Sequence, residues 1–330
     1  SAQELQDWFE IDINNFDYGD WIRGKGLSQV WENKPWNVTL YNDYRFFQRK
    51  QVKKVMASLL DDARQYARDQ QDRDIAFSAN IFGFHPHQML FSDLLDYFTV
   101  EYGYRADNFA PDGHATPFLR YGNDRGKPSI LLPSVYTGNL IHSWNTRDIL
   151  QLWTMETYAT GNAFMNARGF YAGKDVQTGE FLELIPDMEE RLSTFHFVED
   201  YGYLWSDKAY ANVALLYSFA TDHINWARED WAGVAYALLD AHIQHDIVSL
   251  GSDPWLEDHF DHSRLDNYEA VVLASAKNMS ESQINALRDY VSTGGALIVI
   301  GSDAGDFNLE NQRFEYPDWE SMTSPGSRTY

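Results

Sequence analysis

The stretch YEAVVLASAKNMSESQINALRDYVSTGGALIVIGSD, residues 268–303, decides the fold class. It predicts an apolar strand (268–275), an amphipathic helix (280–295) and a second apolar strand (295–303). Ser280 and Gln283 have the spacing of a capping box, and the Gly294-Gly295 pair predicts the end of the helix. Strands that are apolar along their whole length, joined through a helix, predict a parallel sheet that is covered on both faces.

Three further elements precede this stretch and extend the same pattern. Residues 211–219 (ANVALLYSF) and 245–251 (HDIVSLG) predict buried strands, and residues 228–243 predict the helix between them. The sequence therefore predicts a flavodoxin-like, amidotransferase-like parallel-sheet domain over residues 208–304. Residues 305–330 are polar and contain proline, glycine and serine, so we expect an irregular tail there.

The first 207 residues predict another α/β unit. Its helices are clearest at 46–69 and 146–160, where apolar residues recur at helical spacing. Its strands are expected at 8–16, 74–82, 96–104, 128–136 and 162–171. This alternation favours a (β/α)8-type barrel, although eight strands are needed and about five are visible. Either further strands are hidden in the sequence, or the barrel is partial and its earlier strands are absent or supplied by another chain.

The composition excludes several classes of function. The chain has 330 residues, a formal net charge of −23 and no cysteine. The negative charge argues against nucleic acid and anionic membranes as partners, because both require a positive surface. No apolar run approaches the roughly 20 residues that span a bilayer. Without cysteine there is no disulfide, no thiolate metal site and no cysteine nucleophile.

The C-terminal unit resembles the trimerisation domain of bacterial beta-galactosidases, which has a glutamine-amidotransferase-like fold. The likeness rests on VALLYS (213–218), L..Y..VVL (265–273) and L..YV..GG.L (287–297). An amidotransferase needs a cysteine nucleophile, which this chain lacks, so the resemblance implies architecture and a homo-oligomer, with a trimer as one form. It also implies a bacterial protein, and it leaves open whether the compartment is the cytoplasm, the periplasm or the exterior.

The N-terminal unit is similar to the second half of a glycoside hydrolase barrel. FSAN (77–80) ends one strand, LDYFTVEYGY (95–104) forms the next, and RYGNDRGKPSILLPS (120–134) and TMETYATGNAFMNARGFY (154–171) follow. In the beta-galactosidases the nucleophilic glutamate lies on the strand equivalent to 128–136, which here holds no carboxylate. The pattern is closer to fucosidase and alpha-galactosidase barrels, with an aspartate nucleophile on the fourth strand and an acid/base carboxylate on a later one. The resemblance implies hydrolysis of an oligo- or polysaccharide without a cofactor.

Glu101 is the candidate acid/base for a glycosidic oxygen. Strand alternation places Glu101 and Thr99 on one face of residues 96–104 and the apolar Phe98 and Val100 on the other. The apolar face is expected to contact helices, so Glu101 is expected to point into the barrel, near its mouth.

Two alternatives remain open for the carboxylates. Glu101 is either catalytic or held in a structural ion pair with Arg120 or Arg168. Asp12 is the candidate nucleophile on the first expected strand, and Asn14 stands nearer the end of that strand. An amide at the nucleophile's place favours a relative that has lost catalysis.

Further residues are expected near strand ends or in the loops after strands, where they could bind sugar hydroxyls or stack on sugar rings. In addition to Asn14, these substrate-binding candidates are Asn80, His85, Tyr136, Trp144 and Asn166. Packing within the loops is the alternative for each. His85 and His87 have no identifiable third ligand, so no metal site is expected.

The sequence therefore predicts a glycoside hydrolase, with retention of anomeric configuration as the favoured outcome. The alternative is a non-catalytic carbohydrate-binding or scaffolding relative. A small-molecule enzyme on a flavodoxin-like sheet is disfavoured, because the first strand-to-helix turn of the second unit has no glycine-rich phosphate loop.

Overall fold

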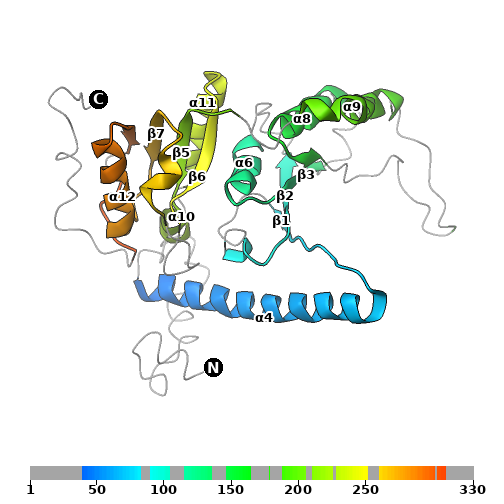
Figure 1. Cartoon of the computed structure of the whole chain (residues 1–330), viewed down its shortest axis with the longest axis horizontal. Coiled ribbons are helices and arrows are strands. Elements are labelled where there is room, and N and C mark those ends of the chain that lie inside the picture. Colours follow the sequence, from blue (N-terminus) through cyan, green and yellow to red (C-terminus); the bar gives the residue numbers. More distant parts are fainter. Residues whose placement is uncertain are drawn as a thin grey trace, which may run out of the picture.

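The computed structural model describes residues 39–82, 90–104, 115–135, 146–164, 178, 188–205, 210–225, 228–251, 260–301 and 303–309. Within these ranges it contains two parallel sheets of four strands each, with helices against them (Figure 1). The expected α/β class is confirmed.

The first sheet has the strand order β1-β2-β3-β4, and every neighbouring pair is parallel. Its strands are β1 (Asn80–Phe82), β2 (Phe98–Tyr104), β3 (Ser129–Val135) and β4 (Ala163–Phe164). The helices that follow them are α6 (Thr116–Asp124), α8 (Thr146–Ala159) and α9 (Met188–Tyr201), the last continued by the 3₁₀ turn η2 (Gly202–Leu204). Parallel strands in sequential order are what a barrel segment requires, and closure into a barrel stays a prediction.

The strand expected at 74–82 is shorter than predicted, because residues 73–79 do not pair with a neighbouring strand. Phe77 N donates to Asp96 Oδ2 over 2.7 Å, and Asp96 N donates to Phe77 O over 2.9 Å. The backbone of this segment is thus bonded to the turn before β2. The strand expected at 8–16 lies outside the described residues, and the one expected at 162–171 is described as far as residue 164.

The second sheet has the order β6-β5-β7-β8 and is also parallel throughout. Its strands are β5 (Val213–Tyr217), β6 (His245–Ser249), β7 (Ala270–Ala274) and β8 (Ala296–Ile300). The helical elements between them are α10 (Phe219–Asn225), α11 (Arg228–Asp240), η3 (His262–Leu265) and α12 (Glu281–Ser292). This is the strand order of a flavodoxin-like sheet, as far as the described strands extend.

Helices cover both faces of the second sheet. The core on the α11 side includes Leu215, Ile247, Trp231 and Ala235, and the core on the α12 side includes Leu216, Val248, Ala286 and Leu287. The capping box of α12 is confirmed, because Gln283 N donates to Ser280 Oγ (3.2 Å) and Ser280 N donates to Gln283 Oε1 (2.9 Å). Past the last strand, Phe307 forms an isolated parallel bridge with Asn278, so the start of the expected tail is bonded to the connection between β7 and α12.

The long helix α4 (Thr39–Gln71) begins earlier than the predicted 46–69 and runs beneath both sheets (Figure 1). One side of it is buried through Phe46, Phe47 and Ala67. Four apolar side chains of the predicted stripe are half or more exposed instead: Val52, Val55, Leu59 and Tyr66. Helical periodicity located the helix but did not identify the face that is buried.

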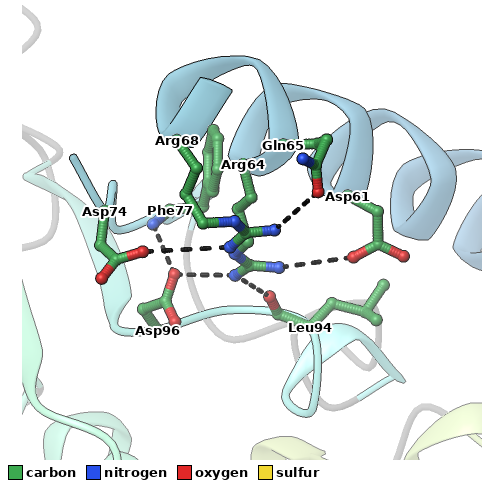
Figure 2. Close-up of polar contacts among 8 residues, drawn as sticks. All are labelled: Asp61, Arg64, Gln65, Arg68, Asp74, Phe77, Leu94 and Asp96. Carbon is green, nitrogen blue, oxygen red and sulfur yellow. Dashed lines mark hydrogen bonds and ion pairs between the residues drawn. The ribbon is translucent and has the colours of Figure 1, made fainter. Parts of the chain in front are cut away.

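Polar contacts tie each half of α4 to a different sheet. Near its C-terminal end, Arg64 Nη2 donates to Asp96 Oδ2 (2.8 Å) and to Leu94 O (3.2 Å), just before β2 (Figure 2). Near its N-terminal end, Arg49 Nη1 donates to His223 Nδ1 on α10, beside the second sheet. The helix therefore contacts both halves of the described structure.

Helix α6 joins the two sheets into one hydrophobic core. Phe118 lies 6.5 Å from Trp231 between ring centroids, and Tyr121 lies 5.8 Å from Tyr217, while Tyr121 also lies 6.2 Å from Phe98 of β2. The same cluster of buried residues extends from β2 and β3 to β5 and β6. The boundary predicted at 207/208 stays a prediction, and the sheets on either side of it share a core.

Candidate functional site

Strand β2 places Glu101 on the face opposite to the one against which α6 packs. Phe98 and Val100 are buried, with 3% and 2% of their surface exposed, and belong to the core that α6 contacts. Glu101 is half-buried and lies on the other face with Thr99, as the alternation of the strand predicted. Glu101 is the fourth of the seven residues of β2, so the strand continues three residues beyond it.

The neighbouring strands define the surroundings of Glu101. Its Cα partners across the sheet are Phe82, the last residue of β1, and Leu132 of β3. Two residues earlier along both strands, Asn80 is paired with Thr99. Thr99 Oγ1 is 2.7 Å from Ser78 Oγ, so a pair of hydroxyl groups precedes the carboxylate on its face of the sheet.

The two faces of the first sheet differ in burial. Leu131 and Phe164, which are register partners, are 1% and 8% exposed on the helix-covered face. Ile130 and Leu132 are half-buried and Ala163 is exposed on the face that carries Glu101. The described side chains of this face are thus less buried than those of the helix-covered face, with the exception of Thr99, which is 9% exposed.

Glu101 is the only carboxylate on the four strands of the first sheet as described. Strand β3 carries none, and this agrees with the difference from beta-galactosidases noted above. A second carboxylate for a two-carboxylate mechanism has to come from a segment other than these strands.

Arg120, one of the two expected structural partners of Glu101, is directed toward the second sheet. It lies on α6, which packs against Phe98 on the opposite face of β2 from Glu101. Its Nη2 donates to Gln244 Oε1 over 3.1 Å. The described contacts of Arg120 thus join α6 to β6, and Arg168 lies outside the described residues.

A buried polar cluster surrounds the start of β6. Burial lowers the pKa of His245 to about 4, the Nδ1 contact with Ile243 O (3.0 Å) opposes this, and the charge of Arg120 lowers the pKa further. Burial raises the pKa of Asp246, against the opposite effects of the Tyr268 hydroxyl, which donates to Asp246 Oδ2 over 3.0 Å, and of Arg120. The cluster lies at the junction between the sheets, on the opposite side of the first sheet from Glu101.

Most of the predicted site residues cannot be placed relative to Glu101. Asp12, Asn14, His85, Tyr136, Trp144 and Asn166 lie outside the described residues, and Asn80 is described by its backbone alone. The structure therefore brings together Glu101 and the backbone of Asn80, on adjacent strands, and tests no other pairing.

Two structural residues were missed from the sequence. Asn162, which is buried, accepts from Ser129 N (2.8 Å) and donates to Asn123 Oδ1 (3.1 Å) and Thr160 Oγ1 (3.0 Å), so it joins β3, α6 and the end of α8. Asp124 pairs with Arg264 across the two sheets. The sequence offers one sign of this role of Asn162, which is its position directly after Gly161, the expected end of the helix.

No group of three or more histidine or acidic side chains within the described ranges is placed to hold a metal ion. Among the helices in those ranges, none is both long and apolar enough to cross a bilayer.

Comparison with known proteins places the chain among relatives of glycoside hydrolases. An alpha-agarase from Thalassotalea agarivorans is 23% identical over 302 residues, which cover 86% of this chain and 20% of the agarase. The chain therefore spans about one fifth of the length of this curated relative. No protein-family model matches the chain.

Solved structures show the same likeness at the level of the fold. The beta-galactosidase from Rahnella sp. R3 gives a TM-score of 0.64 at 14% identity, over 95% of this chain and 48% of that one. A GH42 exo-carrageenase from Bacteroides ovatus gives 0.64 at 10% identity, over 95% and 45%. The beta-galactosidase from Bacillus circulans sp. alkalophilus gives 0.63 at 16% identity, over 83% and 42%. The chain thus spans less than half of each of these glycoside hydrolases and shares their α/β fold.

Proposed function

We propose that this chain forms part of a glycoside hydrolase that acts on a polysaccharide, with Glu101 as the general acid/base. The observation that carries the proposal is the position of Glu101. It is a half-buried carboxylate on an inner strand of a parallel sheet, on the face opposite to the one that α6 covers. The fold shared with glycoside hydrolases, and the names agarase and carrageenase among the relatives, support a polysaccharide substrate.

The chemistry proposed for Glu101 is proton transfer at the glycosidic oxygen. The carboxylic acid protonates the departing oxygen as the bond to the anomeric carbon breaks, and the carboxylate later takes a proton from the attacking water. Asp12 is the proposed nucleophile of a retaining mechanism. A retaining pair requires the two carboxyl groups to lie about 5–5.5 Å apart, whereas an inverting pair requires about 6.5–9.5 Å.

The variant Glu101→Gln tests the proposal. On agarose or carrageenan, turnover is expected to fall about 10²–10⁴-fold, because the leaving oxygen loses its proton donor. On an aryl glycoside with an acidic phenol as leaving group, bond cleavage needs little protonation, so that step is expected to survive. Glu269→Gln, on the exposed start of β7, is the matched control and is expected to keep wild-type turnover. Full activity of Glu101→Gln on the polysaccharide would contradict the assignment.

The second candidate function is carbohydrate binding without hydrolysis. It is favoured by one observation, the absence of a second carboxylate on the described strands of the first sheet. It predicts that a polysaccharide in the gel retards the wild-type chain in affinity electrophoresis. It also predicts that the chain releases no reducing ends from that polysaccharide. The same pair of measurements therefore separates the two functions.

Assembly of several copies is proposed from the resemblance to a trimerisation domain. Strand β8 lies at the edge of the second sheet and leaves Ile298, Val299 and Ile300 substantially exposed. Sedimentation equilibrium of the chain, with Ile298→Glu as the comparison, tests whether this edge takes part in assembly.

A further inference from the structure

We propose that the end of α9 carries a second carbohydrate site, a surface patch that binds a neutral polysaccharide away from Glu101. The patch consists of Phe197, Tyr201, Tyr203 and Trp205. The proposal depends on the proposed function for one point, namely that the ligand is a polysaccharide. The names agarase and carrageenase among the relatives support that class of ligand.

The rings of Phe197, Tyr201 and Tyr203 form a continuous chain on the surface, and the half-buried ring of Trp205 lies next to Phe197. Ring centroids lie 4.8 Å apart for Phe197 and Tyr201, 6.4 Å for Phe197 and Trp205, and 6.5 Å for Tyr201 and Tyr203. Their interplanar angles are 36°, 60° and 43°, so the rings are tilted and present several faces and edges. These spacings are on the scale of one pyranose ring.

The patch is open to solvent although it is aromatic. Tyr203 is 78% exposed, and Phe197 and Tyr201 are 40% and 42% exposed. Contiguous exposed apolar surface on a soluble protein commonly marks a binding site. Tyrosine suits a sugar in particular, because its ring contacts the C–H face while its hydroxyl group bonds to sugar hydroxyls.

The other side of α9 holds the patch in place. Thr194 is buried, and Phe195 lies 6.0 Å from Phe164 of β4 between ring centroids. Phe164 lies on the helix-covered face, in register with Leu131 and opposite to the face of Glu101. Because α9 packs in the outer layer beside α8, the patch is separated from Glu101 by the sheet (Figure 1).

The surrounding charge selects among the ligands that an aromatic patch could take. Glu199 and Asp200 are exposed on the same turn of α9, and the formal net charge of the chain is −23. Carboxylates accept hydrogen bonds from sugar hydroxyls, but they repel sulfate groups and other acidic chains. A neutral polysaccharide is therefore the occupant that the local charges favour.

The test is affinity electrophoresis of the full chain in gels that contain agarose, as the neutral polysaccharide, or carrageenan, as the sulfated one. Glu101→Gln serves as the background, so that neither polysaccharide is hydrolysed during the run. We expect retardation by agarose that depends on the patch, whereas any retardation by carrageenan through the site of Glu101 is expected to be the same with and without the patch residues. The double variant Tyr201→Ala/Tyr203→Ala is expected to weaken agarose binding about tenfold, because two stacking rings are removed.

Tyr66→Ala is the matched control, since Tyr66 is a 64% exposed tyrosine on α4, far from the patch in the sequence. It is expected to bind agarose as the parent does. An unchanged thermal midpoint shows that the double variant is folded. The proposal is overturned if the parent does not bind agarose, if the double variant binds as tightly, or if it changes the sedimentation coefficient, which would assign the patch to protein contact. Failure of the proposed hydrolysis is seen independently, as turnover that Glu101→Gln does not reduce.

Discussion

Asp124 and Arg264 form an ion pair across the junction of the two sheets, with Asp124 Oδ1 2.6 Å from Arg264 Nη2. Asp124 is the last residue of α6, and Arg264 lies in the 3₁₀ helix η3, between β6 and β7 of the second sheet. Asp124 Oδ2 also accepts from Ser249 N at 3.2 Å, and Arg264 Nη1 donates to Ser249 O at 2.9 Å. Burial raises the pKa of Asp124, and the charge of Arg264 opposes the rise. The pair joins α6 to the end of β6.

Replacing Asp124 by alanine tests how much this pair holds the sheets together. The variant leaves a partly buried guanidinium without its carboxylate, so the free energy of unfolding is expected to fall by about 3 kcal/mol. Asp93→Ala is the control, because Asp93 pairs with Lys53 at 2.8 Å on the surface. That change is expected to lower the free energy by less than about 1 kcal/mol. Urea unfolding measures both, and equal losses would remove the special role of the buried pair.

His245 predicts a pH dependence of stability. Its pKa is about 4 in the folded chain, against 6.5 for an unperturbed histidine, so between these values the unfolded chain binds a proton that the folded chain does not. Stability is therefore expected to fall as the pH drops from 6.5 to 4, by about 3 kcal/mol in total. His245→Gln is expected to lose this component of the slope, whereas a change at exposed His196 keeps it. Parallel slopes for wild type and His245→Gln in urea titrations would contradict the assignment.

The close packing around Gly122 predicts that a larger side chain does not fit at this position of α6. A Cβ atom at this position collides with Ser129 Oγ and comes within 3.2 Å of Phe98 Cδ2. Gly122→Ala is therefore expected to destabilise the chain by about 1–3 kcal/mol, despite the better helix propensity of alanine. Gly233→Ala, at an open position on α11, is the opposite case and is expected to stabilise by about 0.5–1 kcal/mol. Thermal midpoints that move in the same direction for both variants would show that α6 has room to shift.

Asn162 predicts the cost of losing a buried amide. Alanine at this position leaves Ser129 N without its acceptor, at the start of β3. The expected loss is about 2–3 kcal/mol, because a buried N–H group is left unsatisfied. Asn285→Ala removes an exposed amide that contacts Arg288 at 3.1 Å, and it is expected to cost less than about 0.5 kcal/mol. If Asn162→Ala lowers the free energy of unfolding by as little as Asn285→Ala does, then Ser129 N has found another acceptor.

The second sheet could be predicted in detail because its signals are local. Four continuous apolar runs mark β5 to β8, and the capping box at Ser280 and Gln283 marks the start of α12. Buried parallel strands need no alternation, so the runs of β5, β6 and β7 are recognisable without knowing their neighbours. Strand β8 has the same apolar pattern, but most of its side chains are exposed at the edge of the sheet. The same holds for the faces of β2, where Phe98 and Val100 are buried as alternation predicts.

The elements that were missed depend on contacts distant in the sequence. Helix α6 is nine residues long and contains Gly122 and Asn123, both weak helix formers, so tertiary packing has to stabilise it. Its partners Trp231 and Arg264 follow it by more than a hundred residues. Of the candidate site, the strand and face of Glu101 were predictable, whereas its catalytic partner stays a prediction because Asp12 lies outside the described residues.

Helix α4 contacts both sheets at once, and the two contacts depend on its helical phase. Arg49 and Arg64 hold opposite ends of the described structure, through His223 and Asp96. Fifteen residues separate them, which corresponds to a rise of about 22 Å and a rotation that leaves both on nearly the same side of the helix. One residue inserted between them turns one arginine by about 100° relative to the other, so that only one of the two contacts can form. The two contacts of α4 can therefore form together only while its helical phase matches the arrangement that the shared core around α6 gives to the two sheets.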